Sequence, residues 1–391
     1  MREGWTYRKL GDICTSELGK TLNQSKDTGE LRPYLCSINV QWDHIDLSTV
    51  KQARFEDTDD ERYSVTAGDL LVCEGGDIGR AAIWSSSESM LYQNALHRIR
   101  FNGSYLPRFY LYYLHFLKTN GTLDAQYGKG VTIKHLVKSS LMSIPVPVPF
   151  LAEQKRIVAE LDLLQEIIDK QKAQLKELDT LAQTIFYDMF GDPVENEKGW
   201  KKTTIGEICT IKGRIGFRGY TREDLVEKGE GAITLSPSNI VNDALDLTKC
   251  SYISWYKYEE SPEIMIFEGD IIYAKTASIG KVALVRHLPC EATINPQFIV
   301  LKNINCDKEY ILGYLKSAEF KALANTIVRG VAIPTLSQAN FALLPIPVPP
   351  LTLQQSFAEK IEAIEHQKAS INASIAETQK LFDYTMDKYF G

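Results

Sequence analysis

The chain has 391 residues, enough for two or three domains, because a single hydrophobic core stops growing near ~250–300 residues. Its hydrophobic fraction of 44% and charged fraction of 24% exclude a fibrous or largely disordered protein. It has no apolar run of ~18 residues to cross a membrane, and seven cysteines without a CxxC pair argue against a disulfide framework or zinc ribbon, so we expect a cytoplasmic protein without membrane contact.

The net charge of −6 is concentrated in two short segments. Residues 1–150 and 193–350 are each neutral overall, whereas residues 151–192 carry a net charge of −4 and residues 351–391 a net charge of −2. A protein with a negative net charge does not attract DNA through its overall charge. Any DNA contact must therefore come from local basic patches in the two neutral segments.

Both halves of the chain follow one sequence pattern. WTYRKLGDIC, from Trp5, matches WKKTTIGEIC, from Trp200, and GDLLVCEGGDIGR matches GDIIYAKTASIGK 201 positions later. IPVPVPFLAEQ matches LPIPVPPLTLQ 200 positions later. Two unrelated α/β domains with coincidental turns would not keep so constant a separation. We therefore predict a duplicated unit whose turns and apolar positions agree while its polar surfaces differ.

Each copy opens with a domain that we predict to be α/β (α+β) with many short strands. Glycine-aspartate turns open the apolar runs GDLLVCE and GDIIYAK, and PRFYLYYLHFLKTN and KEYILGYLKSAEFKALAN predict one helix in each copy. Prolines at alternate positions of 145–149 and 345–349 end the domains. Because proline disfavours helices and central strands, these tracts predict an extended, stiff joint, with a PxxP recognition segment as the alternative.

A long helix follows each proline tract. From 152 to 190 no Pro or Gly occurs and apolar residues recur at 4-3 spacing, which is typical of a coiled coil; an amphipathic helix lying on its own domain is the alternative. The second copy has a weaker seam. Gln171 and Lys368 interrupt the seams and are candidates for setting their register. The predicted seam residues are Ile157, Leu161, Leu164, Ile168, Leu175, Leu178, Phe357, Ile361, Ile364, Ile371, Ile375 and Phe382.

The connectivity predicts how the two helices run. The first starts at domain 1 and ends where domain 2 begins, and the second starts where domain 2 ends, so the two must be antiparallel. At 1.5 Å per residue each is ~57 Å long. We therefore predict a pseudo-two-fold dumbbell, in which domains 1–150 and 192–350 are separated by the antiparallel coiled-coil helices 151–191 and 351–391.

The sequence lacks a recognisable catalytic or cofactor-binding motif. Neither GxxxxGK[ST] nor GxGxxG after a strand occurs, which argues against a P-loop and against a dinucleotide or adenosylmethionine glycine loop. The nearest match is Asn295-Pro296-Gln297-Phe298, which is similar to the Asn-Pro-Pro-Tyr/Phe loop of amino-methyltransferases but has glutamine in place of the second proline. We predict no catalytic residues, no metal ligands and no cofactor in this chain.

The densest basic stretch is WKKTTIGEICTIKGRIGFRGYTR, residues 200–222. Arginines in such a glycine-rich loop can reach guanine edges or phosphates, whereas a solvated basic loop is the alternative. The corresponding loop of the first copy offers Asn and Gln, which suit adenine, so we expect the copies to contact different bases. The predicted contacts in the two loops are Lys20, Asn23, Gln24, Lys26, Lys212, Arg214, Arg218 and Arg222.

Two further loop pairs carry basic residues at matching positions. They are EGGDIGR with KTASIGK, and YGKGVTIKHL with VRGVAIPTL, and we predict phosphate contacts there. Asn39 and Asn239 are candidates for DNA contact and equally for turn formation. The basic residues of these loops are Arg80, Lys129, Lys275, Lys281 and Arg329.

Taken over its whole length, the chain resembles the specificity (S) subunit of type I restriction–modification systems. The resemblance rests on the joints IPVPVPFLAEQKRIVAELD and LPIPVPPLTLQQSFAEKIE, the helix ends TIFYDMFGD and YTMDKYFG, and the paired GD(L/I)(L/I)…IG(R/K) turns. It implies a non-catalytic subunit with two target-recognition domains, each of which reads one half of a split, asymmetric site in double-stranded DNA. The helices would set the gap between the halves.

The resemblance also implies partners. Two DNA adenine methyltransferase (M) subunits would dock on the domains and helices and bring S-adenosylmethionine, and two restriction (R) subunits would bring ATP and Mg for translocation and cleavage. A type IIB-like system with a similar subunit is the alternative assembly. The competing functions are a fused methyltransferase with a hidden site and a coiled-coil scaffold that binds proteins.

Overall fold

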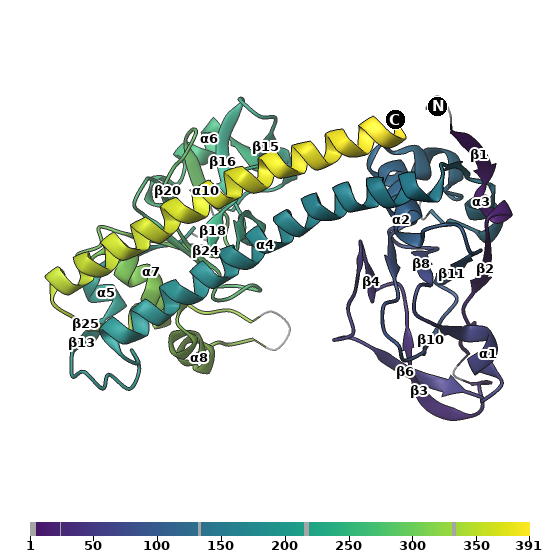
Figure 1. Ribbon diagram of the computed structural model, residues 1–391. Helices are drawn as coiled ribbons and strands as arrows, with labels where there is room; N and C mark the ends of the chain where they lie inside the picture. The colour runs from purple at the N-terminus through teal and green to yellow at the C-terminus, as the bar shows by residue number, and fades with distance from the viewer. Residues whose placement is uncertain (1–4, 24, 132–133, 215–218, 331–333) are drawn as a thin grey trace. The chain divides into compact units, whose positions relative to one another are not determined.

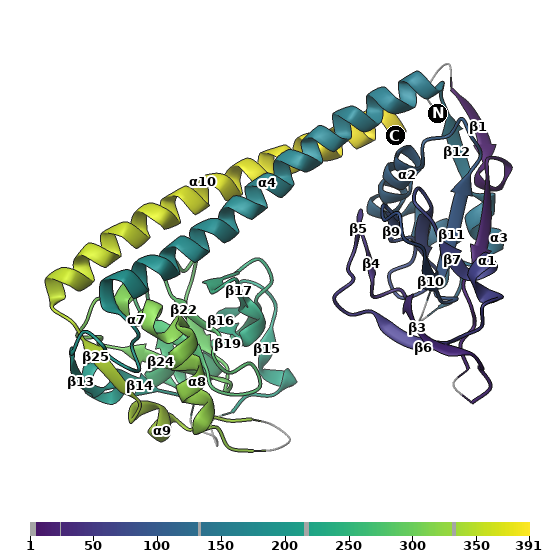
Figure 2. The ribbon, with the colours of Figure 1, turned by 60° about the horizontal axis from the view of Figure 1, so that its bottom comes forward.

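The computed structural model describes residues 5–391 except 24, 132–133, 215–218 and 331–333. It divides into two compact units, Met1–Lys172 with Ala373–Gly391 and Ala173–Asn372. Figures 1 and 2 show that each unit combines an α/β domain with one half of each of two long helices, α4 (Leu151–Phe190) and α10 (Leu351–Phe390).

The first unit is built on two four-stranded sheets. One is antiparallel in the order β2-β11-β8-β9, and the other, β6-β3-β10-β7, contains the parallel pair β3 and β10. Two further strand pairs, β1 with β12 and β4 with β5, complete it. The elements are β1 (Thr6–Lys9), β2 (Cys14–Leu18), β3 (Glu30–Leu35), β4 (Val40–Gln41), β5 (His44–Ile45), β6 (Lys51–Phe55), α1 (Asp59–Tyr63), β7 (Ser64–Val65), β8 (Leu70–Cys73), β9 (Ala81–Ile83), β10 (Met90–Tyr92), β11 (Leu96–Phe101), α2 (Pro107–Thr119), α3 (Lys138–Ser143) and β12 (Pro145–Val148).

The second unit repeats this arrangement. Its sheets β14-β24-β21-β22 and β15-β19-β16-β23-β20 follow the same strand order, with the parallel pair β16 and β23 and one additional edge strand, β15. Strands β13 with β25 and β17 with β18 form the smaller pairs. The elements are β13 (Lys201–Thr204), α5 (Ile205–Ile208), β14 (Thr210–Lys212), β15 (Leu225–Val226), β16 (Gly231–Leu235), β17 (Ile240–Val241), β18 (Ala244–Leu245), β19 (Ser251–Ser254), α6 (Trp255–Glu259), β20 (Met265–Ile266), β21 (Ile271–Ala274), β22 (Val282–Leu284), β23 (Ala292–Ile294), β24 (Phe298–Lys302), α7 (Lys308–Lys316), α8 (Ala318–Thr326), α9 (Gln338–Ala342) and β25 (Pro345–Val348).

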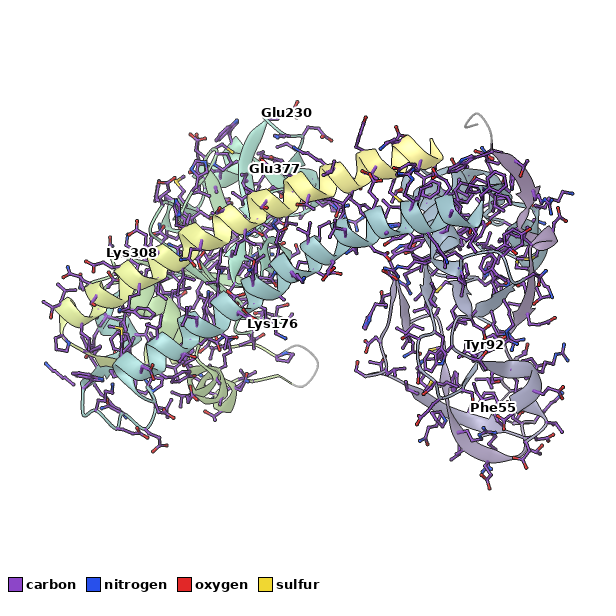
Figure 3. All side chains as sticks on the ribbon, viewed as in Figure 1. Phe55, Tyr92, Lys176, Glu230, Lys308 and Glu377 are labelled. Carbon is purple, nitrogen blue, oxygen red and sulfur yellow. The ribbon has the colours of Figure 1, made fainter. Side chains whose placement is uncertain are left out.

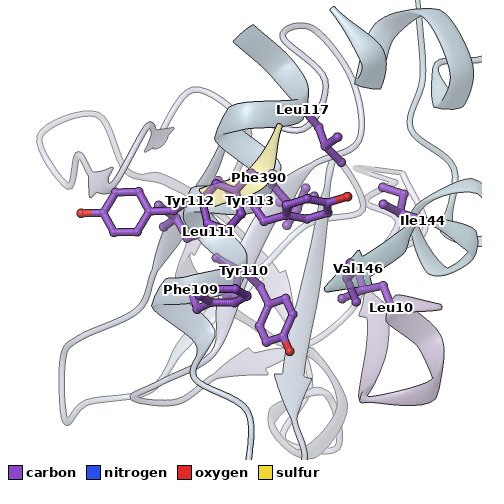
Figure 4. Close-up of a cluster of buried hydrophobic side chains, with 14 of the residues drawn as sticks. Leu10, Phe109, Tyr110, Leu111, Tyr112, Tyr113, Leu117, Ile144, Val146 and Phe390 are labelled. Carbon is purple, nitrogen blue, oxygen red and sulfur yellow. The ribbon is translucent and has the colours of Figure 1, made fainter. Parts of the chain in front are cut away.

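Helix α2 fills the core of the first unit. Pro107 occupies its first turn, where a backbone N–H has no helical partner, and residues 109–114 are all buried. A helix that is buried all round needs apolar partners on every side. Figure 4 shows Leu10 and Phe390 among these partners, and the Phe390 ring lies 5.3 Å from that of Phe109. The last turn of α10 therefore completes this core.

The corresponding region of the second unit forms two helices, α7 and α8, so the prediction of one helix there is wrong. Ser317 separates them with an extended backbone, and its Oγ accepts a hydrogen bond from the N–H of Phe320 at 3.2 Å. A serine cap of this kind starts a new helix. The apolar spacing continues through the break, which is why periodicity alone did not reveal it.

The proline tracts are extended, as predicted, but they are paired strands and not free joints. Strand β12 pairs with β1, and the N–H of Leu10 donates to the carbonyl of Ile144 at 2.9 Å to continue the ladder. Alternate residues of an antiparallel strand donate to its partner, so prolines at the remaining positions cost no hydrogen bond. Strand β25 pairs with β13 in the same way.

A buried glutamine ties each proline strand to the helix that follows it. Gln154 Oε1 accepts the N–H of Leu106 at 2.9 Å, and its Nε2 donates to the carbonyl of Pro149 at 2.9 Å. Gln354 makes the same two bonds in the second unit, at 2.8 and 2.7 Å. The stiffness expected of the joint therefore comes from strand pairing and from this side chain as much as from proline.

The two long helices pack against each other in antiparallel directions within each unit. In the first unit Arg156 bonds to Tyr389 at 3.1 Å and Gln171 bonds to Ser374 at 2.6 Å. Residue numbers therefore fall along α10 as they rise along α4, which makes the helices antiparallel. In the second unit Lys368 pairs with Asp179 at 2.8 Å. The predicted seam residues Ile157, Leu161, Leu164, Ile168, Phe357, Ile361, Ile364 and Phe382 are buried, and Leu175, Leu178, Ile371 and Ile375 are half-buried.

The outer faces of the two helices are largely polar. Lys176 on α4 and Glu377 on α10 are both exposed (Figure 3). Gly191, at a φ of 76°, ends α4, and its N–H donates to the carbonyl of Tyr187 at 2.8 Å. No helix in the described parts of the chain is long and apolar enough to cross a membrane.

Candidate nucleic-acid interface

Loops from separate parts of the sequence meet beside the end of β8 in the first unit. The carbonyl of Lys20 accepts the N–H of Asn94 at 3.0 Å, which joins the loop after β2 to the loop before β11. The N–H of Glu74 donates to Ala95 at 2.9 Å, and the carbonyl of Glu74 accepts the N–H of Leu136 at 2.7 Å. We call residues 74–76, 93–95 and 134–136 the loop cluster of the first unit.

The second unit has the same cluster beside the end of β21. The N–H of Lys275 donates to the carbonyl of Gln297 at 2.8 Å, and the carbonyl of Lys275 accepts the N–H of Leu336 at 2.8 Å. Residues 275–277, 295–297 and 334–336 form this second loop cluster. Backbone bonds therefore fix one arrangement in both units, although the side chains differ.

Seven of the predicted contact residues that the structure describes are exposed. Two of them, Asn23 and Lys281, have partners inside their own unit, and the other five are basic. Lys129 and Arg329 occupy matching positions, because their backbones pair with residues 135 and 335 next to the two loop clusters. Lys26 in the first unit, and Lys212 and Arg222 in the second, are exposed as well. Their exposure leaves these ammonium and guanidinium groups accessible to phosphates.

The segment that is similar to a methyltransferase loop forms a turn. Asn295 is 8% exposed, its Oδ1 accepts the N–H of Gln297 at 2.9 Å, and its Nδ2 donates to Gln297 Oε1 at 2.9 Å. The turn itself thus accounts for the Asn295 amide. In the described part of the chain, no group of three or more His, Cys, Asp or Glu residues could hold a metal ion.

Comparison with known proteins decides the family. The type I restriction modification DNA specificity domain matches residues 2–180 and again residues 197–379. This chain belongs to the family of type I restriction–modification specificity subunits. The resemblance inferred from the sequence is confirmed, and so are the internal duplication and the assignment to a non-catalytic DNA specificity subunit.

Curated relatives match the specificity subunit over most of its length. The MjaVIII specificity subunit of Methanocaldococcus jannaschii is 22% identical over 93% of this chain and 87% of the relative. The EcoBI specificity subunit of Escherichia coli is also 22% identical, over 84% of this chain and 74% of the relative.

Solved structures confirm the predicted fold class of two α/β domains with two long helices packed together. A chain from a structure that describes complex assembly and conformational transition of the type I R-M system has a TM-score of 0.57 and 18% identity, covering 100% of this chain and 98% of that one. The type I S subunit from M. genitalium has a TM-score of 0.51 and 15% identity, with the same coverage.

Asn39 and Asn239 form turns in the specificity subunit, one of the two roles that the sequence left open. Asn39 is completely buried; its Oδ1 accepts the N–H of Cys36 at 2.9 Å, and its Nδ2 donates to the carbonyl of Asp46 at 2.9 Å. Asn239 repeats this pattern with Ser236 and Asp246, at 3.0 and 3.2 Å. These amides are fully used inside the domain.

Arg80 and Lys281 hold the same turns from the other side. Arg80 Nη2 donates to the carbonyl of Ser37 at 2.7 Å. Lys281 Nζ donates to the carbonyls of Pro237 and Ile240 at 2.9 and 3.0 Å. The basic residue at this position of both copies therefore stabilises the asparagine turn by hydrogen bonds within its own domain.

Three other predicted contacts also have partners inside their own unit. Lys20 is paired with Asp59 at 2.7 Å. The Asn23 Oδ1 accepts the Ser25 hydroxyl at 2.8 Å. Arg214 is 7% exposed and lies over the Tyr220 ring, and its burial lowers the pKa of the guanidinium. Gln24 and Arg218 were also predicted to contact DNA and lie outside the described residues.

One position was missed in the first unit, although its equivalent was predicted in the second. Glu74 and Lys275 occupy the same place in the two loop clusters, and both side chains are half-buried. Burial raises the pKa of Glu74 and lowers the pKa of Lys275. The signal available in the sequence was the charge reversal between EGGDIGR and KTASIGK.

Proposed function

We propose that this specificity subunit reads a split, asymmetric site in double-stranded DNA, one half with each domain. The observation that carries the proposal is the loop cluster, in which Glu74 and Lys275 make the same two backbone bonds but carry different side chains. One scaffold with two surfaces suits two unlike half-sites. The proposed recognition domains are residues 1–150 and 192–350, and residues 151–191 and 351–391 are the helical spacer.

Exposed basic side chains supply the phosphate contacts in this proposal. Lys26 and Lys129 serve the first half-site, and Lys212, Arg222 and Arg329 serve the second. Contacts of this kind position a protein on the duplex without reading its sequence. Because both domains are neutral overall, these local charges and the partner subunits provide the electrostatic part of the affinity.

The remaining predicted residues fall into two groups. Gln24, Arg218 and Lys275 are proposed as direct contacts. The others have intramolecular partners and are proposed to shape the loops that meet DNA; they are Lys20, Asn23, Asn39, Arg80, Arg214, Asn239 and Lys281.

The helices are proposed to set the gap between the half-sites and to dock two methyltransferase subunits. Leu181 on α4 and Leu381 on α10 are 46% and 51% exposed, occupy matching repeat positions, and lie one in each unit. Two equivalent apolar positions suit two copies of one partner. In the proposed complex the methyltransferase subunits bring S-adenosylmethionine, and two restriction subunits bring ATP and Mg.

Methylome sequencing tests the proposal. The chain is expressed with its neighbouring methyltransferase subunit, and separately without it, in a host that lacks restriction–modification systems of its own. We expect a split, asymmetric motif methylated on adenine only when both proteins are present. Methylation by this chain alone would indicate a hidden methyltransferase instead. A stable complex without new methylation would indicate a protein scaffold.

A further inference from the structure

Glu74 and Lys275 are the first residues after strands β8 and β21. The N–H of each bonds to the loop before β11 or β24, and the carbonyl of each bonds to the loop that carries Leu136 or Leu336. The two backbones are therefore held identically. Only the side chain differs, and it differs by reversal of charge.

Neither side chain has a partner that explains it. The Glu74 carboxylate and the Lys275 ammonium make no hydrogen bond or ion pair with the described residues, although both are half-buried. His135, near Gly75, partly offsets the cost of burying the carboxylate, and among the described residues no charged group offsets the burial of Lys275. Burying a charge without a partner is unfavourable, so the contacts made within the described part of each unit do not explain either residue.

We propose that Glu74 and Lys275 are specificity-determining residues that contact bases, one in each half-site, with opposite hydrogen-bonding character. An ionised carboxylate only accepts hydrogen bonds, which suits the exocyclic amine of cytosine in the major groove. An ammonium only donates, which suits O6 and N7 of guanine. The inference rests on the proposed function and adds the base that each side chain selects.

The neighbouring residues agree with this division of labour. The exposed Lys129 and Arg329 lie next to the two loop clusters and are basic in both units. Phosphate contacts carry no sequence information, so the same kind of residue can serve both half-sites. Glu74 and Lys275 sit on the same frame and differ. Two different bases at equivalent positions of the half-sites require a different side chain on the same backbone, which is what Glu74 and Lys275 provide.

Selection from randomised duplexes tests the inference. The complete complex of this chain with its methyltransferase subunits selects DNA from a library, and the wild type is compared with Glu74→Gln and Lys275→Met. Glu74→Gln keeps the shape of the side chain, and Lys275→Met keeps an unbranched side chain, one atom shorter, without the ammonium group. Glu88→Gln and Lys228→Met are matched controls, because both residues are exposed and lie outside the loop clusters.

The expected result is a change at one base pair of one half-site. With Glu74→Gln, a cytosine preference moves toward adenine, which glutamine can bind through N6 and N7, by about 5- to 150-fold. With Lys275→Met, a guanine preference in the other half-site is lost by a similar factor. The control variants keep the wild-type motif.

Two outcomes would overturn the inference, and they are distinguishable. If the wild type selects a split motif and both variants select the same motif, Glu74 and Lys275 are not base contacts and the proposed function stands. If the wild-type complex selects no split motif, the proposed function fails and this inference fails with it. Thermal denaturation of each variant complex shows whether a weakened selection reflects unfolding, and a folded variant with an unchanged motif counts against the inference.

Discussion

Replacing Gln154 by alanine is expected to loosen the point at which the first domain joins α4. The side chain is 1% exposed and bonds two backbone groups, the N–H of Leu106 and the carbonyl of Pro149. Alanine can make neither bond, and the site is too buried for solvent to replace them. The structure therefore predicts a stability loss confined to the first unit.

The magnitude follows from the two groups that lose their partner. Each buried backbone group left without a hydrogen bond costs about 1–3 kcal/mol. Allowing for partial relaxation, we expect the free energy of unfolding of the first unit to fall by about 3 kcal/mol. For a domain of this size that corresponds to roughly 6–12 °C in Tm, and to a rise of about 150-fold in the population of the open state.

Hydrogen exchange measured by mass spectrometry localises the effect. Peptides from α2 and β12 should exchange faster in Gln154→Ala, while peptides from the second unit keep the wild-type rate. Gln354→Ala should give the mirror result, because Gln354 makes the same two bonds. Gln379→Ala, at an exposed position of α10, is the control. A loss below about 0.5 kcal/mol, or equal loss in both units, would refute the reasoning.

Three further predictions concern charge, pH and length. Replacing Lys129 or Arg329 by alanine in the assembled complex should make the DNA association constant less dependent on salt. The slope of log K against log salt concentration should fall in magnitude by about 0.9, as expected for the loss of one phosphate contact. An unchanged slope in anisotropy titrations would show that the residue does not contact DNA. Burial lowers the pKa of His97 to about 4, so the unfolded chain binds a proton near pH 6.5 that the folded unit does not bind, and the first unit should lose roughly 3 kcal/mol of stability as the pH falls from about 6.5 to 4. His97→Ile, which introduces the residue at the equivalent register position of β24, Ile299, should flatten that dependence in urea titrations. Inserting one heptad in both α4 and α10 should lengthen the gap in the methylated motif, and an unchanged gap would contradict the spacer role.

The large-scale organisation was accessible from sequence because it rests on periodicity. The repeat predicted two copies of one domain, and the 4-3 spacing predicted α4 and α10, whose seam positions are covered in the structure. Periodicity fails where a break leaves the apolar spacing intact. Ser317 divides α7 from α8 in this way, and the division is visible in its extended backbone and in its capping bond to Phe320. The pairing of the proline strands was equally hidden, since their partners β1 and β13 lie far away in sequence.

At the interface, sequence reasoning gave too much weight to polar residues that the two copies share. Asn39 with Asn239, and Arg80 with Lys281, hold matching turns in both units, and shared residue types are what a common scaffold requires. Two domains that read different half-sites need different residues where they meet the bases. By that criterion the informative positions are those with identical backbone bonds and unlike side chains. The sequence alone already sets Glu74 opposite Lys275, but only the structure shows that the two residues make identical backbone bonds, and that identity is what separates a change of contact from a change of loop.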